Sequence, residues 1–203
     1  MARGELDVII RLAVPAPPRR SALGASMGLR MQTLFIGSLT LEPQIAAHAE
    51  EMFVVLSDPA IYEYENEPPQ SASGLRERFA ELESRQSPNG REQWLNWVIR
   101  LPSKELIGYV QATVHPGGRA AIAYELNSAY WGRGLARQAV QAMIGELIQN
   151  YGVTLLTAVL KQQNQRSFRL LHRVGFTLAS PAEHVQADVE RDEFFMLRRV
   201  RRA

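Results

Sequence analysis

Two glycines placed between a β-like run and a long helical pattern constrain this chain more than any other feature. Residues 131–136 read Trp-Gly-Arg-Gly-Leu-Ala, after the β-like run 121–126 and before a helical pattern that starts at Leu135. Glycine adopts a positive φ without steric cost and leaves no Cβ between the backbone and a ligand. A strand that passes into a helix through such a turn presents backbone N–H groups to an anion. The segment therefore predicts a turn that binds a phosphate or pyrophosphate.

The charges around this turn favour the same interpretation. The first N–H groups of a helix have no intrahelical partner, and the helix N-terminus carries about half a positive charge. Arg133 and Arg137 can add charge-assisted hydrogen bonds. The alternative is a glycine turn beside solvated arginines, because short glycine-containing strings are frequent in loops.

Two other glycine-rich motifs do not fit. A Walker loop ends in Gly-Lys-Ser/Thr, whereas Gly134 is followed by Leu135 and Ala136. The dinucleotide fingerprint needs a third glycine after a first strand and an acidic residue about 20 positions later. Neither a nucleotide triphosphatase nor a Rossmann domain is therefore expected.

A second motif follows the apolar, strand-like run 153–160. From Asn164 to Phe176 the chain reads Asn-Gln-Arg-Ser-Phe-Arg-Leu-Leu-His-Arg-Val-Gly-Phe. Together and in this order, the two motifs resemble the GNAT superfamily of acyl-CoA-dependent N-acyltransferases. In that family the first motif cradles the coenzyme A pyrophosphate, and the second runs from an Asn through a short helix to Gly-Phe. The resemblance covers roughly residues 31–199.

Within the superfamily, the chain is most similar to the RimJ/RimL-type branch, which acetylates ribosomal-protein N-termini. The aromatic pair Tyr130-Trp131, the run 107–109 (Ile-Gly-Tyr) and Asp58-Pro59 all lie where that branch carries them. Trp131 departs from the Arg or Gln that opens the motif in the wider family. That departure concerns its side chain and not the backbone cradle.

The resemblance implies a fold and a reaction. The fold is a single three-layer α/β domain, α+β in some schemes, with a mixed, mostly antiparallel sheet of about six to seven strands and about four helices. The reaction is direct attack of a primary amine on acetyl-CoA in a ternary complex, with no metal. The leading acceptor is a protein N-terminal α-amine. A small-molecule amine such as an antibiotic, polyamine or amino acid is one alternative, and a non-catalytic CoA-binding sensor is another.

The resemblance also implies roles for individual residues. The N–H of Leu126 would stabilise the oxyanion, and Asn164 and Ser167 would contact the pantetheine arm or sulfur. Ser167 is a candidate proton donor, and Glu125 is a candidate base unless it faces the opposite side of its strand. The predicted cofactor-binding residues are Leu126, Trp131, Gly132, Arg133, Gly134, Leu135, Ala136, Arg137, Asn164 and Ser167.

One expected residue is absent. Many family members carry a tyrosine acid seven residues after the motif Asn, and this chain has Leu171 there. The neighbouring His172 would point about 100° away around the helix, which favours a structural or surface histidine.

Residues 62–67 form an acidic and aromatic patch that could attract a cationic amine. The alternative is a solvated loop with packed tyrosines. Lysine titrates near ~10.4 and an α-amine near ~8, so deprotonating lysine at pH 7 costs about 3 kcal/mol more. A site without an obvious strong base therefore favours an α-amine.

Composition agrees with one globular domain. The 203 residues are 46% hydrophobic and 22% charged, which is ordinary for a chain long enough to build one core. The chain has no cysteine, so a reducing, cytoplasmic location is compatible. A net charge of +2 gives no reason to expect nucleic acid, and no apolar run is long enough to span a membrane. His48, His115 and His184 lack metal-ligand spacing. A monomer or a homodimer is expected.

Residues 1–30 are predicted to be a flexible leader before a domain at 31–203. Pro15, Pro17 and Pro18 interrupt any helix there. A basic targeting segment is one alternative, and a start of translation at Met27 or Met31 is another.

Hydrophobic periodicity predicts alternating strands and helices. A helix starting near Pro43 is expected to turn Ile45, Ala49, Met52, Phe53 and Leu56 inward, and Ser71 or Ser73 is expected to cap a second helix. The other predicted helices are 135–150 and 165–173. The predicted strands are 33–41, 94–101, 106–115, a strand ending at 126, 154–160, 176–180 and 193–200.

Overall fold

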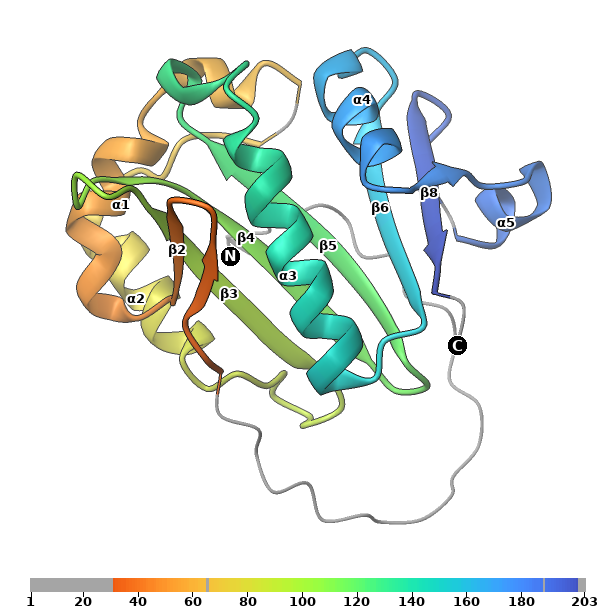
Figure 1. Ribbon diagram of the computed structural model, residues 1–203, viewed down its shortest axis with the longest axis horizontal. Coiled ribbons are helices and arrows are strands. Elements are labelled where there is room, and N and C mark those ends of the chain that lie inside the picture. The colour runs from red at the N-terminus through yellow and green to blue at the C-terminus, as the bar shows by residue number, and fades with distance from the viewer. Residues whose placement is uncertain (1–30, 65, 188, 201–203) are drawn as a thin grey trace, which may run out of the picture.

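One sheet runs through the whole of the domain (Figure 1). The computed structural model describes residues 31–200, apart from positions 65 and 188. The predicted leader 1–30 lies outside the described residues. In chain order the elements are β1 (Leu34–Ile36), β2 (Leu39–Pro43), η1 (Ala46–His48), α1 (Ala49–Leu56), η2 (Pro59–Tyr62), α2 (Ala72–Leu82), β3 (Gln93–Arg100), β4 (Leu106–His115), β5 (Arg119–Leu126), η3 (Ser128–Tyr130), α3 (Leu135–Tyr151), β6 (Leu155–Lys161), α4 (Gln165–Arg173), β7 (Thr177–Leu178), α5 (Pro181–Gln186) and β8 (Glu193–Arg199).

The predicted fold class is confirmed. The strand order is β1-β2-β3-β4-β5-β6-β8-β7, and every neighbouring pair is antiparallel except β5 and β6. Within the described ranges the sheet has eight strands and five α-helices accompany it, against the expected six to seven and four. The fold is therefore a mixed α/β domain with a mostly antiparallel sheet.

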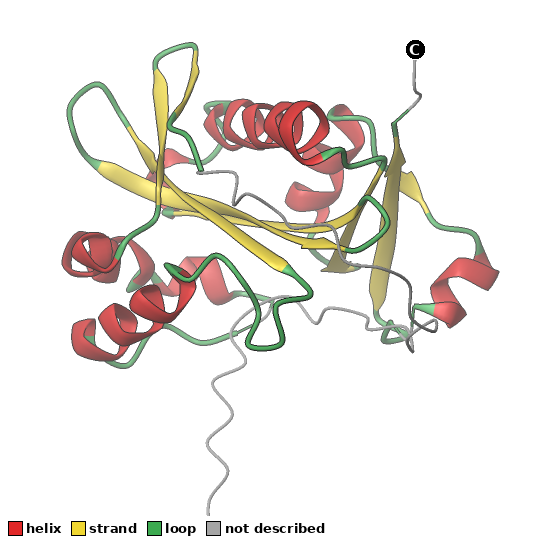
Figure 2. Cartoon of the chain, turned by 90° about the horizontal axis from the view of Figure 1, so that it is seen from below, coloured by secondary structure: helices red, strands yellow, loops and turns green. Residues whose placement is uncertain are grey.

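Helices cover both faces of this sheet (Figure 2). α3 packs on one face, where its apolar stripe joins the main core that includes Trp97, Ile122 and Phe176. α1 and α2 pack on the other face in a smaller core around Met52 and Val98. The central strands are apolar on both faces, because each face is covered by a helical layer.

The predicted strand 33–41 is in fact a hairpin. Gly37 has a φ of +57° and reverses the chain between β1 and β2, which then pair antiparallel. Glycine adopts this left-handed conformation without a Cβ clash. Period-2 alternation continues through both arms of a hairpin, so the pattern alone did not reveal the turn.

The helix expected near Pro43 begins later. Pro43 is the last residue of β2, and the next N–H, of Gln44, still donates to the Asn96 carbonyl oxygen at 2.9 Å. This bond prolongs the strand, so the 3-10 turn η1 and then α1 begin downstream. Ile45, which was expected to face the core, is therefore 40% exposed. Phe53 was also expected to face the core but is only partly buried, whereas Val55 of the same helix is buried.

Most other elements lie within a residue or two of their predictions. Ser71 is the cap of α2, because its hydroxyl accepts from the Gly74 N–H at 3.1 Å. Near the C-terminus, the strand expected at 176–180 is only two residues long, and the short helix α5 was missed. α5 has a full capping box between Ser180 and Glu183 with a proline in its first turn, so a local signal was present.

β5 and β6 stay together at one end only. They pair at three positions, Arg119 to Ala121 against Leu155 to Thr157, and then separate (Figure 1). The strands diverge toward the end where α3 begins and α4 stands. At this end of the molecule the sheet is therefore interrupted between β5 and β6.

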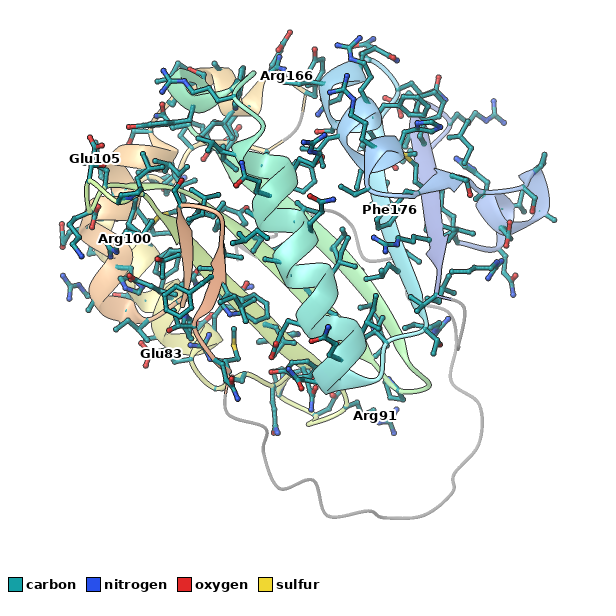
Figure 3. The ribbon with its side chains drawn as sticks, viewed as in Figure 1. Glu83, Arg91, Arg100, Glu105, Arg166 and Phe176 are labelled. Carbon is teal, nitrogen blue, oxygen red and sulfur yellow. The ribbon has the colours of Figure 1, made fainter. Side chains whose placement is uncertain are left out.

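Replacement of Phe176 tests the core that supports α4. Phe176 is fully buried (Figure 3), and its N–H donates to the Leu171 carbonyl at the end of α4. We expect Phe176→Ala to lower the free energy of unfolding by about 3–5 kcal/mol in urea titrations. Phe35→Ala is the control, because Phe35 is 77% exposed and its loss should cost about 0.5 kcal/mol or less. Equal losses in the two variants would contradict this packing.

Candidate active site

A cavity of about 530 Å³ lies where β5 and β6 separate. Its walls come from the end of β5, the turn before α3, the first turn of α3, β6, α4, η2 and the segment after η2. All the residues predicted to bind the cofactor or to act in catalysis line this one cavity, and they are Glu125, Leu126, Trp131, Gly132, Arg133, Gly134, Leu135, Ala136, Arg137, Asn164 and Ser167. The fold thus brings the two sequence motifs together.

The glycine turn has the geometry of an anion cradle. Gly132 and Gly134 have φ values of +74° and +75°, and a Cβ built on either would meet no atom within 4 Å. Glycine is therefore needed here for its conformation, and the space in front of the backbone is open to a ligand. Gly134 is the N-cap of α3 and supplies no capping side chain, so the first N–H groups of the helix face this space uncapped.

Arginines surround the cavity. The predicted Arg133 and Arg137 are joined by Arg166, Arg169 and Arg173 from α4, which sequence reasoning missed. The last three are spaced by three and four residues on one face of a helix, a signal that could have found them. Among the described lining residues, Glu125 is the only carboxylate. The charge and the cradle fit a ligand with several phosphate groups, such as coenzyme A.

Trp131 fixes the end of β5. Its indole Nε1–H donates to the Leu126 carbonyl oxygen at 2.8 Å. The guanidinium carbon of Arg166 lies 3.6 Å from the centroid of the Trp131 ring, and Figure 3 shows Arg166 between α4 and the turn before α3. The same guanidinium is 3.5 Å from a carboxylate oxygen of Glu63. Arg166 therefore links three walls of the cavity.

The N–H of Leu126 points toward the opening. Bonded and non-bonded pairs alternate along an antiparallel ladder. The N–H of Asn127 donates to the Ile107 carbonyl oxygen at 2.9 Å, so the preceding pair, Gly108 and Leu126, is a non-hydrogen-bonded pair. The backbone groups of Leu126 are consequently directed away from β4, on the side where β6 has separated.

At the start of α4, Asn164 and Ser167 are tied to each other. The Asn164 Oδ1 accepts from the Ser167 N–H at 3.0 Å and caps the helix. The Tyr124 hydroxyl lies 3.5 Å from the Ser167 carbonyl oxygen. Burial raises the pKa of Tyr124 to about 12, although its hydrogen bond with Ser167 acts in the opposite direction. Tyr124 thus places a protonated phenol close to Ser167. Tyr124 was not among the site residues predicted from the sequence.

The remaining α4 positions agree with expectation. Leu171, which stands where many relatives have tyrosine, is buried in the main core. His172 is exposed and stacks on Phe168, with ring centroids 6.3 Å apart. His172 does not belong to the described lining of the cavity.

Glu125 lies on the opposite face of β5 from Tyr124 and Leu126, because successive side chains of a strand alternate. This is the orientation for which a packed or solvated carboxylate was expected, but Glu125 also lines the cavity and so stays a candidate base. Its cross-strand partner is Tyr109 of β4. Burial and, after it, the charge of Glu125 raise the pKa of Tyr62 of η2. Glu125 therefore lines the cavity with two tyrosines near it that do not belong to the described lining.

Hydrogen bonds attach the wall beside Glu125, which includes η2, to the end of β5. The Asp58 carboxylate accepts from the Ser128 N–H at 2.7 Å and from the Ala60 N–H at 3.0 Å. The Asn127 side-chain amide donates to the Val55 carbonyl oxygen at 3.2 Å. These bonds hold the η2 segment over the residues that follow Leu126.

The arginine-rich turn and the carboxylate of Glu125 thus line one cavity, an arrangement that suits a phosphorylated donor beside a second substrate. Residues 38–177 match the family described as the acetyltransferase (GNAT) domain, and the chain belongs to this family. It is an acetyl-CoA-dependent N-acetyltransferase.

Several proteins are similar to it. An uncharacterized N-acetyltransferase, p20 of Bacillus licheniformis, is 26% identical over 148 residues, which span 72% of this chain and 83% of p20. The structure of RimL, a ribosomal L7/L12 α-N-protein acetyltransferase, in complex with coenzyme A has a TM-score of 0.69 at 17% identity and covers 83% of this chain and 98% of that one. The structure of AAC(6′)-Ib in complex with ribostamycin and coenzyme A has a TM-score of 0.62 at 18% identity, with 80% and 94% covered. These structures share the fold, and their names and complexes associate one with a ribosomal protein and the other with ribostamycin.

Two further findings concern the described residues. They contain no group of three or more His, Cys, Asp or Glu side chains arranged to hold a metal ion. None of their helices is long and apolar enough to cross a bilayer.

Asp58→Ala tests how the η2 wall is held. Burial raises the pKa of Asp58, but hydrogen bonds from Ser128 and Ala60 outweigh it and place the pKa below 3.8. We expect the variant to lose about 2 kcal/mol of unfolding free energy at pH 7, from a lost cap and a lost backbone contact. Because the folded-state pKa is the lower one, this contribution is present above pH 3.8 and is lost as the pH falls through the folded-state value.

The measurement is urea unfolding of both proteins between pH 7 and pH 3. Asp192→Ala is the control, since Asp192 is exposed and pairs with Lys161 at the surface. A difference between Asp58→Ala and wild type that does not shrink at low pH would contradict the assigned contacts.

Proposed function

We propose that this chain transfers the acetyl group of acetyl-CoA to the α-amine of a protein or peptide N-terminus, by direct attack in a ternary complex. The observation that carries the proposal is one cavity lined by the glycine turn, by five arginines and by a single described carboxylate, Glu125. The proposal places the reaction in the cytoplasm, a compartment with which a cysteine-free chain is compatible.

The residues proposed to bind acetyl-CoA are those of the cradle and α4. The N–H groups of the glycine turn and of the first turn of α3 would hold the pyrophosphate, with the arginines as counter-charges. Asn164 and Ser167 would contact the pantetheine arm or the sulfur. The bound thioester supplies the activated acyl group.

Three groups would serve the chemistry. Glu125 would take a proton from the incoming ammonium, directly or through water, so that the amine attacks in its neutral form. The N–H of Leu126, directed into the opening, would donate to the developing oxyanion. The Ser167 hydroxyl would donate a proton to the departing sulfur, with the Tyr124 phenol beside it.

Acceptor choice rests on acidity and on the surroundings of Glu125. A single carboxylate is a weak base, and an α-amine is about 3 kcal/mol easier to deprotonate at pH 7 than a lysine amine. RimL, which shares the fold, acts on a protein α-amine by its name. A small-molecule amine is the second candidate, because AAC(6′)-Ib shares the fold with ribostamycin as its partner.

Gly134→Glu tests the cradle. A glutamate there would place bulk and negative charge in the space proposed for the pyrophosphate, and we expect calorimetric affinity for acetyl-CoA to fall at least about 100-fold, as expected when a buried charge contact becomes repulsive. Gly90→Glu is the matched control, because Gly90 also has a positive φ, +66°, and open space around it but does not line the cavity. Equal affinity in wild type and Gly134→Glu, or equal losses in both variants, would sink the cradle assignment.

Glu125→Gln and an acceptor panel test the reaction. We expect the variant to lose about 100-fold or more in kcat/KM, the usual scale for a lost general base, while its affinity for acetyl-CoA is unchanged. The panel compares peptides with a free α-amine, the same peptides with a blocked α-amine and an internal lysine, and polyamines and aminoglycosides. Faster turnover of the small amines than of free-α-amine peptides would favour the second candidate. Full activity in Glu125→Gln would remove Glu125 as the base.

A further inference from the structure

Two tyrosines that come from different elements lie near the side chain of Glu125. Tyr109 pairs with it across the β4–β5 ladder, so both side chains lie on the same face of the sheet. Tyr62 approaches from η2, which Asp58 fastens to the end of β5. Tyr109 itself packs against the smaller core under α1.

The backbone next to this pair leaves no room for a side chain on β4. A Cβ built on Gly108, the residue before Tyr109, would lie 2.1 Å from the Glu125 carbonyl oxygen. No side chain larger than hydrogen fits there without moving a strand, so the backbone of β4 is seated directly against that of Glu125. The placement of Tyr109 relative to Glu125 is therefore set by rigid backbone and not by a flexible loop.

The two phenols direct their protons differently. The Tyr62 hydroxyl donates to the Leu56 carbonyl oxygen at 2.8 Å, so its proton is engaged by the backbone. The Tyr109 side chain lies across the ladder from Glu125, on the same face of the sheet. Burial, followed by the charge of Glu125, raises the pKa of Tyr109 well above its usual value. Tyr109 therefore keeps its proton at neutral pH, so a hydrogen bond between the two side chains would run from phenol to carboxylate.

We propose that Tyr109 is a positioning residue for Glu125, whose carboxylate it orients and holds in the charged form by donating one hydrogen bond from the neighbouring strand. This inference deepens the proposed function, on which its catalytic meaning rests. Hydrogen bonding to the charged form of a carboxyl group favours that form, and here the donor acts against the burial of the site. Tyr109 thus sets the pH above which Glu125 can accept a proton.

Other titratable or charged groups border this carboxylate. Tyr62 and Asp58 face it from the η2 segment, and Tyr64 follows them in the cavity wall. Tyr124 is next to Glu125 in β5 but on the other face, and Arg166 stands on α4. Tyr109→Phe removes one donor and leaves all these groups in place, so it isolates the hydrogen bond.

The test is a carbon-13 NMR titration of the Glu125 carboxyl group in the full chain without substrate, with Glu125→Gln identifying its signal. We expect Tyr109→Phe to move the midpoint to higher pH by about one unit, the scale of one hydrogen bond to a charged group. Tyr62→Phe is the matched control, because it removes a hydroxyl that donates to the backbone, and its midpoint should stay within about 0.3 units. An unchanged midpoint in Tyr109→Phe, or equal shifts in both variants, would overturn the inference. Thermal unfolding verifies that each variant is folded.

Kinetics separate this inference from the proposed function. The acid limb of kcat/KM against pH should follow the NMR midpoint in wild type and in Tyr109→Phe, while KM for acetyl-CoA stays the same. A midpoint that moves while the acid limb does not would support Tyr109 as the partner of Glu125 and overturn Glu125 as the base.

Discussion

The separation of β5 from β6 is the constraint on which the site depends. After Ala121 the backbone of β5 no longer has a strand partner on the β6 side. Backbone polar groups without a partner need another one. The carbonyl of Leu126 finds it in the Trp131 indole at 2.8 Å, whereas the N–H of the same residue is directed into the opening. One local departure from regular pairing therefore creates the cavity and aims a donor into it.

Successive side chains of β5 alternate between the two faces of the sheet, and this alternation decides which functional group lies on which face. Tyr124 and Leu126 belong to the face covered by α3, where the cradle and the arginines lie, and Glu125 belongs to the face covered by α1 and α2. Three consecutive residues at the end of β5 thus face the two sides of the sheet. A slip of one residue in the pairing of β4 and β5 would exchange the faces, and Gly108, seated against the Glu125 backbone, fixes this register.

The parts of the site that could be predicted from the sequence are those encoded by residues close together in the chain. The cradle is encoded in consecutive residues, and the cap of α4 by Asn164 follows from a short motif, so both lie where they were expected. The partnership of Glu125 with Tyr109 depends on strand register, and the bond from Trp131 to Leu126 depends on how the chain turns after β5. Neither could be read from the pattern of residues. The β1–β2 hairpin was missed for a related reason, since alternation continues through a turn made by one glycine.

The distribution of charge in the cavity also bears on the order in which ligands bind. Five arginines line the cavity that Glu125 shares, and their combined field opposes the approach of a second cation. A donor with several phosphate groups neutralises that field when it occupies the cradle, and the carboxylate of Glu125 then dominates the potential around its side chain. The arginines that are proposed to hold the donor would therefore discourage an ammonium from entering an empty site. This arrangement favours binding of the acyl donor before the amine, and it follows from the distribution of charge across a single strand.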